Sequence, residues 1–326
     1  MSRSHTALRI GTRGSALAVW QTERVRALLR SAGHDAERVE IKTTGDLVPD
    51  VPLAKIGTRA LFTKQIDDAL LEKRIDLAVH SLKDLPTELP EGIAVAAVSA
   101  REDARDALIG RGMLRWNEIP HGAMIATSSL RRRAQLLRCR PDLRIADLRG
   151  NVDTRLNKLE AHRDWSAIVL AAAGLVRLGL AHRIGERLPP DIMLPAPGQG
   201  ALAVTVRVGD STVRRWVRDA VHDEDTALQT AAERAFLQRL EGGCQVPVAA
   251  YAQKYSEGPH SGLHLHGRVI SLRGETMAEG HLAELVRDEG DASALGTALA
   301  VHLLDEGAAA ILAEVRAATV PAVSEP

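Results

Sequence analysis

The feature that most constrains the fold is a strand-to-helix turn that occurs twice in the chain. The letters IGTRGS begin at Ile10 and IATSS at Ile125; in each, a short apolar strand stops at a threonine and a nearby serine begins a helix. Strands alternate with helices after each copy, which is typical of a mostly parallel sheet with helices packed on it. The sequence therefore predicts two similar α/β domains, whose ligands lie beyond the carboxyl ends of the strands.

The spacing of apolar residues and the turn residues predict the individual elements. Ser15 is a good N-cap for a helix that stops at Gly33. In the first copy we expect strands over 7–11, 38–43 and 75–81, with helices over 15–33 and 61–73. In the second copy we expect strands over 123–126, 143–147 and 166–172, with helices ending at Leu137 and spanning 151–162.

The last third of the chain has a different pattern. The segment LPAPGQGALA, residues 194–203, contains two prolines and two glycines, and we interpret it as a hinge or a crossover between domains. After it we expect a strand over 201–208, a helix over 226–239, strands from 246, 262 and 276, and a final helix over 292–316. The 326 residues suffice for two or three domains, each with its own core. The predicted fold class is α/β, with two similar mostly parallel-sheet domains and a smaller α+β C-terminal domain.

Charge is unevenly distributed although the formal net charge is zero. Residues 101–199 contain 17 Lys and Arg against 11 Asp and Glu, and Lys158 is the only lysine among these basic residues. Arginine binds carboxylate or phosphate through a planar fork, whereas lysine acts as a point charge. The middle third is therefore expected to meet anions. Aromatic residues form only 2% of the chain, which disfavours nucleic acid as the anion.

Both strand-to-helix turns are candidates for such an anion site. Backbone N–H groups at a helix start attract carboxylate or phosphate, and Arg13, Arg131 and Arg132 lie in or just after the two turns. The alternative is that the hydroxyls of these turns only cap their helices. A solvated basic helix face would likewise explain Arg133, Arg138 and Arg140.

The segment HSLKDLP, residues 80–86, follows a predicted strand and holds a candidate catalytic group. Asp84 lies beside Lys83 at the carboxyl end of that strand, where α/β proteins place catalytic side chains. A carboxyl group there can donate and accept protons. The alternative is a turn aspartate before Pro86. A hydrolytic triad of Ser81, His80 and Asp84 is not expected, because no GxSxG elbow is present.

The two cysteines differ in their surroundings. Cys244 lies in EGGCQVP, where the glycines allow close approach of another molecule, although a buried inert thiol is the alternative. Cys139 is expected to be structural. Two cysteines cannot form a disulfide framework, and the longest apolar run, 167–176, is shorter than the ~20 residues of a membrane helix. These features favour a soluble, cytoplasmic protein.

Three histidines lie close together in the sequence: His260, His264 and His266. Its spacing is compatible with a metal site, but we interpret it as solvent-exposed strand histidines, and no metal is expected. The sequence contains neither GxxxxGK[ST] nor GxGxxG, so no nucleotide cofactor is expected.

Several of these stretches together resemble the hydroxymethylbilane synthase family, also called porphobilinogen deaminase, in unbroken order from Arg9 to about Ala252. The segments that carry the resemblance are IGTRGSALAVWQ, KTTGD, LFTKQIDDALLEKRIDLAVHSLKDLPTELP, TSSLRRRAQLL, LRGNVDTRLNKL, LAAAGLVRLGL, LPAPGQGALA and ERAFLQRLEGGCQVPVAAYA.

The resemblance implies a transferase of porphyrin and heme biosynthesis. Members condense four porphobilinogen molecules head to tail, with loss of ammonia, onto a covalently bound dipyrromethane primer, and then release hydroxymethylbilane by hydrolysis. The resemblance also implies that the first two domains are of the type II periplasmic-binding-protein kind. We expect domains over 1–100 with 200–220, over 101–199, and over 221–326, with a monomer as the working state.

The resemblance assigns residues of this chain to roles. The catalytic residue is Asp84, and Cys244 anchors the dipyrromethane through a thioether. Further cofactor-binding residues are Lys83, Ser129, Arg131, Arg132, Asp46, Thr127 and Ser128. Substrate-binding residues are Arg13, Ser15, Arg149, Asn151, Arg155, Arg177 and Gln199.

The chain departs from the family in its lid. Where the family commonly has Gly-Gly-Lys-Gly-Leu-Phe, residues 57–62 read GTRALF. The absence of these two glycines stiffens the backbone, while Lys55, Arg59 and Phe62 could still contact the polypyrrole.

Two other functional classes are alternatives to an enzyme. A solute-binding protein would explain the arginines but not Cys244, and an RNA-binding protein would bind polyanions in a salt-dependent way.

Overall fold

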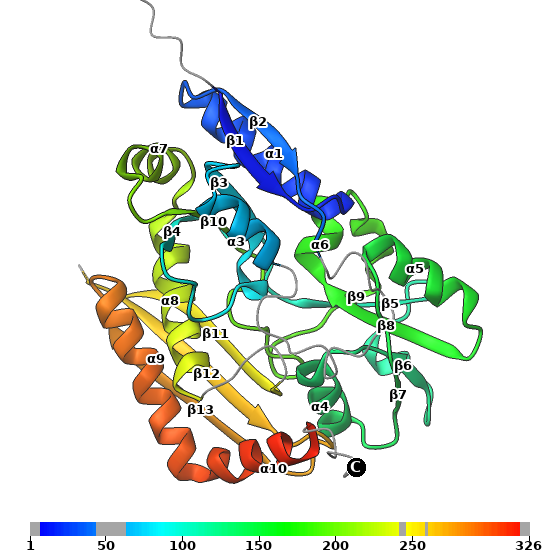
Figure 1. The fold of residues 1–326 in the computed structure, drawn as a ribbon. Coiled ribbons are helices and arrows are strands. Elements are labelled where there is room, and N and C mark those ends of the chain that lie inside the picture. The colour runs from blue at the N-terminus through cyan, green and yellow to red at the C-terminus, as the bar shows by residue number, and fades with distance from the viewer. Residues whose placement is uncertain (1–6, 44–62, 241–245, 258–259, 320–326) are drawn as a thin grey trace, which may run out of the picture. The chain divides into compact units, whose positions relative to one another are not determined.

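The computed structural model describes residues 7–43, 63–240, 246–257 and 260–319, which contain three β-sheets (Figure 1). Within these residues the chain forms two compact units. Unit 1 comprises 7–43, 63–102 and 200–227, and unit 2 comprises the remainder. The chain returns to unit 1 between Gln199 and Gly200, inside the segment that the sequence predicts to be a crossover.

Unit 1 contains a five-stranded sheet in the order β2-β1-β3-β10-β4. Its strands are β1 (Leu8–Thr12), β2 (Ala36–Glu40), β3 (Leu77–Ser81), β4 (Ile93–Val98) and β10 (Leu202–Arg207). Strands β1, β2 and β3 are parallel, and β10 runs antiparallel to both β3 and β4. Helices α1 (Ala16–Ser31) and α7 (Ser211–Val221) pack on one face, and α3 (Lys64–Leu71) packs on the other.

Unit 2 contains a second sheet with the same plan, in the order β7-β6-β8-β5-β9. Its strands are β5 (Asp106–Gly110), β6 (Met124–Ala126), β7 (Arg144–Ala146), β8 (Trp165–Ala171) and β9 (Glu186–Arg187). Three parallel strands again adjoin one antiparallel strand, here β5, and an edge strand beyond it. Helix α4 (Leu130–Cys139) covers one face, and α5 (Val152–Ala161) with α6 (Ala172–Arg177) covers the other. The prediction of two similar α/β sheets is confirmed.

The third sheet, also in unit 2, is an antiparallel meander. It consists of β11 (Val248–Glu257), β12 (His260–Ile270) and β13 (Met277–Leu285) in that order. One of its faces packs against α8 (Glu224–Arg239), α9 (Glu289–Leu303) and α10 (Ala309–Thr319) around the buried ring of Phe236. This is the predicted smaller α+β part of the chain (Figure 1).

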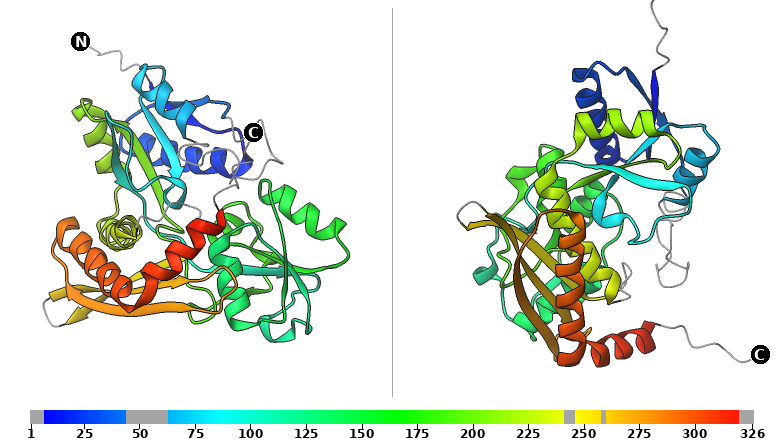
Figure 2. Two further views of the ribbon diagram at one scale, coloured as in Figure 1. Left: turned by 60° about the horizontal axis from the view of Figure 1, so that its bottom comes forward. Right: turned by 90° about the vertical axis from the view of Figure 1, so that its left-hand side faces the viewer.

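The helix predicted over 292–316 is not continuous. A π-helical turn, Leu304–Ala308, separates α9 from α10, because Gly307 takes a left-handed φ of 104°. The two helices run in different directions from this point (Figure 2). The stretch Glu289–Ala318 is long and apolar enough by composition to cross a membrane, but 44% of its most apolar window is buried in the protein. Its apolar residues, including Leu295, Leu299 and Leu303, contribute to the core of the third sheet.

Local signals in the sequence predicted some boundaries well. Ser15 is the N-cap of α1, its Oγ accepting a hydrogen bond from the N–H of Ala18. Gly33 follows the helix with a φ of 85°, as a C-terminal stop requires.

Strands β4 and β5 were not predicted from the sequence. Each is a short apolar run without alternation, because both of its faces are covered.

Gly296 provides a test of how closely α8 and α9 pack. A Cβ atom at this position would overlap the carbonyl oxygen of Ala232 and lie 2.9 Å from the backbone nitrogen of Phe236. Because these obstacles are backbone atoms, the helices must separate to admit a methyl group. We expect Gly296→Ala to destabilise the protein by about 1–3 kcal/mol, measured as the urea midpoint.

Gly209→Ala is the matched control, because nothing lies within 4 Å of its added Cβ and its φ is not left-handed. We expect that variant to change stability by less than about 0.5 kcal/mol. Equal midpoints for the two variants would contradict the close approach of α8 and α9.

Candidate functional site

The carboxyl end of β3 presents Lys83 and Asp84 on a short turn that apolar side chains fix in place. Leu82 and Leu85 are buried on either side of them, and the N–H of Leu82 donates to the carbonyl of Ala201 at 3.0 Å. Asp84 is exposed and Lys83 is half-buried. The two flanking leucines therefore anchor the turn and leave the charged groups accessible.

The end of the neighbouring parallel strand β1 carries Arg13 and Ser15. Since parallel strands end at the same edge of a sheet, these residues and Asp84 belong to one edge of unit 1. Arg13 is half-buried, and its charge acts on the buried imidazole of His80 on β3. Burial first, and Arg13 second, lower the pKa of His80 to about 4.

His80 is therefore neutral at physiological pH. Its Nε2 lies 3.2 Å from the Oγ1 of Thr205 on β10, in the interior of the unit. Ser81 accepts a hydrogen bond from the side chain of Gln21 at 2.8 Å. Adjacent residues of a strand point to opposite faces, so His80 cannot activate Ser81. The expectation that these residues form no hydrolytic triad is consistent with this geometry.

The second sheet brings the predicted anion-binding residues of unit 2 to one edge. The parallel strands β6, β7 and β8 each run into a helix at their carboxyl ends. The first two junctions carry Thr127, Ser128, Ser129, Arg131 and Arg132 after β6, and Arg149, Asn151 and Arg155 after β7; Arg177 is the last residue of α6, the helix that follows β8. Residues far apart along the chain are thus placed on a common edge by the parallel strands.

The hydroxyl groups of the first junction all make internal hydrogen bonds. Ser129 Oγ accepts from the N–H of Arg132 at 3.4 Å as the N-cap of α4. Thr127 Oγ1 accepts from the N–H of Ser129 at 3.2 Å, and Ser128 Oγ accepts from the N–H of Leu148 at 2.9 Å. These bonds order the start of α4, which is the capping role that the sequence left open.

A buried carboxylate holds the two arginines of this junction. Asp106, on β5, is fully buried; its Oδ2 accepts from Arg131 at 2.7 Å and its Oδ1 from the Nε of Arg132 at 2.8 Å. The arginines are themselves only 6% exposed, and they also donate to the carbonyls of Leu194 and Val169. Asp106 was not predicted from the sequence, because one aspartate at the start of a short apolar strand carries no special local signal.

Gln199 belongs to the same buried group. It has no exposed surface, and its Nε2 donates to the carbonyl of Ala104 at 2.7 Å and to Asp106 at 3.2 Å. A direct contact of Gln199 with substrate therefore requires these bonds to open. The amide joins the crossover segment to β5.

The accessible arginines at this edge are those of the other two junctions. Arg149, Arg155 and Arg177 are half-buried, and Asn151 is exposed at the start of α5. Arg155 Nε donates to the carbonyl of Gly150 at 2.7 Å, which orients its side chain across the turn.

Arginines later in α4 contribute to the structure of unit 2. Arg133 is exposed, Arg138 donates to the carbonyl of Glu275 at 3.1 Å, and Arg140 forms a two-bond pair with Asp142. Cys139 lies at the end of α4 with part of its surface exposed, and the partial burial of its sulfur raises the pKa of its thiol.

Five predicted site residues lie outside the described part of the chain. These are Asp46, the lid residues Lys55, Arg59 and Phe62, and the anchor Cys244.

Most of the chain matches known protein families. Residues 8–215 match the family described as "Porphobilinogen deaminase, dipyromethane cofactor binding domain", and residues 227–305 match "Porphobilinogen deaminase, C-terminal domain".

Individual proteins are similar over nearly the whole length. Porphobilinogen deaminase of Geotalea daltonii is 47% identical over 94% of each chain. The protein of that name from Rubrobacter xylanophilus is 50% identical over 94% of this chain and 97% of its own. Among solved structures, a periplasmic substrate-binding protein of an ABC transporter from Coxiella burnetii is 16% identical, with a TM-score of 0.42 over 70% of this chain and 96% of its own.

The Asp106 cluster can be tested by removing its negative charge. Asp106→Asn keeps the size of the side chain but removes the carboxylate charge that two buried guanidinium groups share. We expect a loss of about 3–5 kcal/mol in the free energy of unfolding, measured by urea denaturation.

Asp142→Asn, in the more exposed pair with Arg140, is the matched control and is expected to lose much less stability than Asp106→Asn. A loss at Asp106 no larger than that at Asp142 would show that the buried cluster does not hold unit 2 together.

Proposed function

The chain belongs to the porphobilinogen deaminase family, and from this premise we propose how its residues divide the work of the reaction. The protein is a transferase of porphyrin and heme biosynthesis. It condenses four porphobilinogen molecules head to tail with release of ammonia and delivers hydroxymethylbilane. The family match over residues 8–215 and 227–305 carries this assignment.

We propose Asp84 as the catalytic residue. A carboxyl group donates a proton to the departing amine, so that ammonia leaves, and the resulting carboxylate then stabilises positive charge on the pyrrole nitrogen. Two observations support Asp84 in this role. It is exposed at the carboxyl end of a parallel strand, and the buried neighbours Leu82 and Leu85 hold its turn rigidly. Lys83 supplies a cation beside it.

We propose that the half-buried arginines bind the acid side chains of the substrate. Each porphobilinogen carries two carboxylates, which a guanidinium group binds in bidentate fashion. The residues proposed for this role are Arg13 and Ser15 on unit 1, and Arg149, Asn151, Arg155, Arg177 and Gln199 on unit 2. Partial burial reduces the screening of these charges by water and strengthens the binding of carboxylates.

The donor groups of unit 2 fit a cofactor that carries several carboxylates. The N-terminal end of α4 offers backbone N–H groups, and the same edge of the sheet collects guanidinium groups from three junctions. We propose that this edge, with Thr127, Ser128, Ser129, Arg131 and Arg132, holds the dipyrromethane that is linked to Cys244. The bound dipyrromethane supplies the primer to which pyrrole units are added. The proposed cofactor-binding residues also include Lys83 and Asp46. The proposed lid consists of Lys55, Arg59 and Phe62.

Asp106 gives Arg131 and Arg132 a fixed orientation within that set. Two bonds to one carboxylate, and one carbonyl bond each, leave the guanidinium planes little rotational freedom. Groups held in this way need no reorganisation when a carboxylate arrives. We therefore propose that Asp106 orients both arginines toward the cofactor.

We further propose three domains, over 1–100 with 200–220, over 101–199, and over 221–326. The three separate sheets support this division. A monomer suffices for the reaction, because all proposed residues belong to one chain. A cytoplasmic location suits it, since a reducing compartment keeps the Cys244 thiol free for thioether formation.

Replacing the proposed acid tests the assignment. We expect Asp84→Asn to keep the cofactor and the thermal midpoint of the wild type, because Asp84 is exposed, but to lose about 10²–10⁴-fold in kcat. The measurement is the rate of porphobilinogen consumption by the purified holoenzyme.

Glu91→Gln, an exposed carboxylate of the same unit outside the proposed site, is the control and is expected to keep full activity. If Asp84→Asn turned over at near the wild-type rate, another group would have to be the acid.

A further inference from the structure

A group of metal-ligating side chains lies on the face of the third sheet opposite its packed helices. His266 on β12 is directly opposite His281 on β13, and the next pair along the same face is Arg268 and Glu279. Residues two apart in a strand share a face. The flanking residues Leu265 and Val269 point the other way, into the core. The sheet pairing thus unites side chains that are about 15 positions apart.

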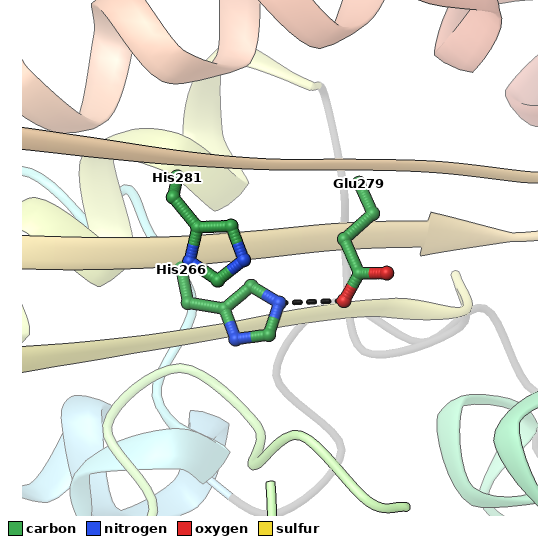
Figure 3. Close-up of side chains that lie close together, drawn as sticks. All are labelled: His266, Glu279 and His281. Atoms are coloured by element: carbon green, nitrogen blue, oxygen red, sulfur yellow. Dashed lines mark hydrogen bonds and ion pairs between the residues drawn. The ribbon is translucent and has the colours of Figure 1, made fainter. Parts of the chain in front are cut away.

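The side chains converge closely (Figure 3). His266 Nε2 lies 2.6 Å from Oε1 of Glu279, and the rings of His266 and His281 stack with centroids 3.9 Å apart. One ligand atom from each of the three residues lies within 4.8 Å of the other two. His264, two positions before His266, lies with its ring 5.3 Å from that of His281.

The types of ligand indicate which ion would fit. Two imidazoles and a carboxylate are a donor set that zinc prefers, whereas Mg²⁺ and Ca²⁺ take oxygen ligands alone. With Zn–N bonds of about 2.0–2.1 Å, ligand atoms of a tetrahedral ion lie roughly 3.3–3.5 Å apart. Small side-chain rotations bring the present spacing to that value, because His281 is exposed and has room to move.

We propose that His266, Glu279 and His281 form a Zn²⁺-binding site, with His264 as the nearest further ligand. From the sequence alone we interpret His264 and His266 as solvent-exposed strand histidines. The spacing of histidines along β12 cannot show that the neighbouring strand β13 brings His281 and Glu279 to the same place.

Arg268 limits how strongly this site can bind a cation. Its Nε donates to Glu279 at 2.8 Å, and its Nη1 donates to the side chain of Gln135 on α4 at 2.8 Å. The ion therefore competes with Arg268 for the carboxylate, and the nearby positive charge weakens cation binding. The site is exchangeable, unlike a structural zinc centre, which is closed by four protein ligands.

Zinc titration of the untagged, chelator-treated holoenzyme tests the site. We expect one equivalent of Zn²⁺ to bind, measured by competition with a chromophoric chelator. His266→Ala and His281→Ala should each weaken binding at least tenfold, because each removes a ligand. His121→Ala, another exposed histidine of unit 2, and Cys139→Ser should bind as the wild type does.

A second measurement needs no variant. X-ray absorption of the one-to-one zinc complex should show nitrogen and oxygen neighbours near 2.0–2.1 Å with imidazole scattering, and no sulfur near 2.3 Å. Sulfur coordination, the absence of saturable binding, or equal affinity of the wild type and His281→Ala would each overturn the proposal.

Discussion

The structure of unit 2 depends on one buried carboxylate. Asp106 on β5 pairs with Arg131 and Arg132 from the first turn of α4, and it also accepts a bond from Gln199 of the crossover. One side chain therefore connects β5 of the second sheet, the start of α4, and the segment that leads back to unit 1. A buried charge of this kind is stable only while its partners stay in place. The geometry that suits this edge for binding carboxylates and the geometry that stabilises the unit are the same.

The sequence predicted features that depend on neighbouring residues. The alternation of strands and helices gave both α/β sheets, and Ser15 and Gly33 marked the ends of α1. The position of Asp84 after the end of a strand was predicted, because a strand end is visible in the local pattern. Features that depend on distant residues were missed. Asp106 pairs with side chains 25 and 26 positions away. The break at Gly307 was missed for a different reason, because it is one glycine in an otherwise continuous apolar helix.

The reaction explains why both units place their polar groups at the carboxyl ends of parallel strands. A growing chain of pyrroles gains two carboxylates with each unit, so the binding groups must be numerous, cationic and geometrically fixed. Strand ends meet this need, because the sheet holds each junction while the following helix start adds N–H donors. Unit 1 uses the same plan for a different purpose: the end of β3 carries the accessible carboxyl group of Asp84 beside Lys83, and Arg13 follows the neighbouring strand β1.

The central claim is that pyrrole units are added to a primer held covalently by Cys244. The most direct measurement is the intact mass of the denatured protein before and after mixing with porphobilinogen. The account predicts that the wild type carries one dipyrromethane and then shows discrete heavier species, each one pyrrole unit apart, while Cys244→Ser carries none. A bare polypeptide mass in protein that turns over porphobilinogen, or the same adduct on Cys244→Ser, would contradict it.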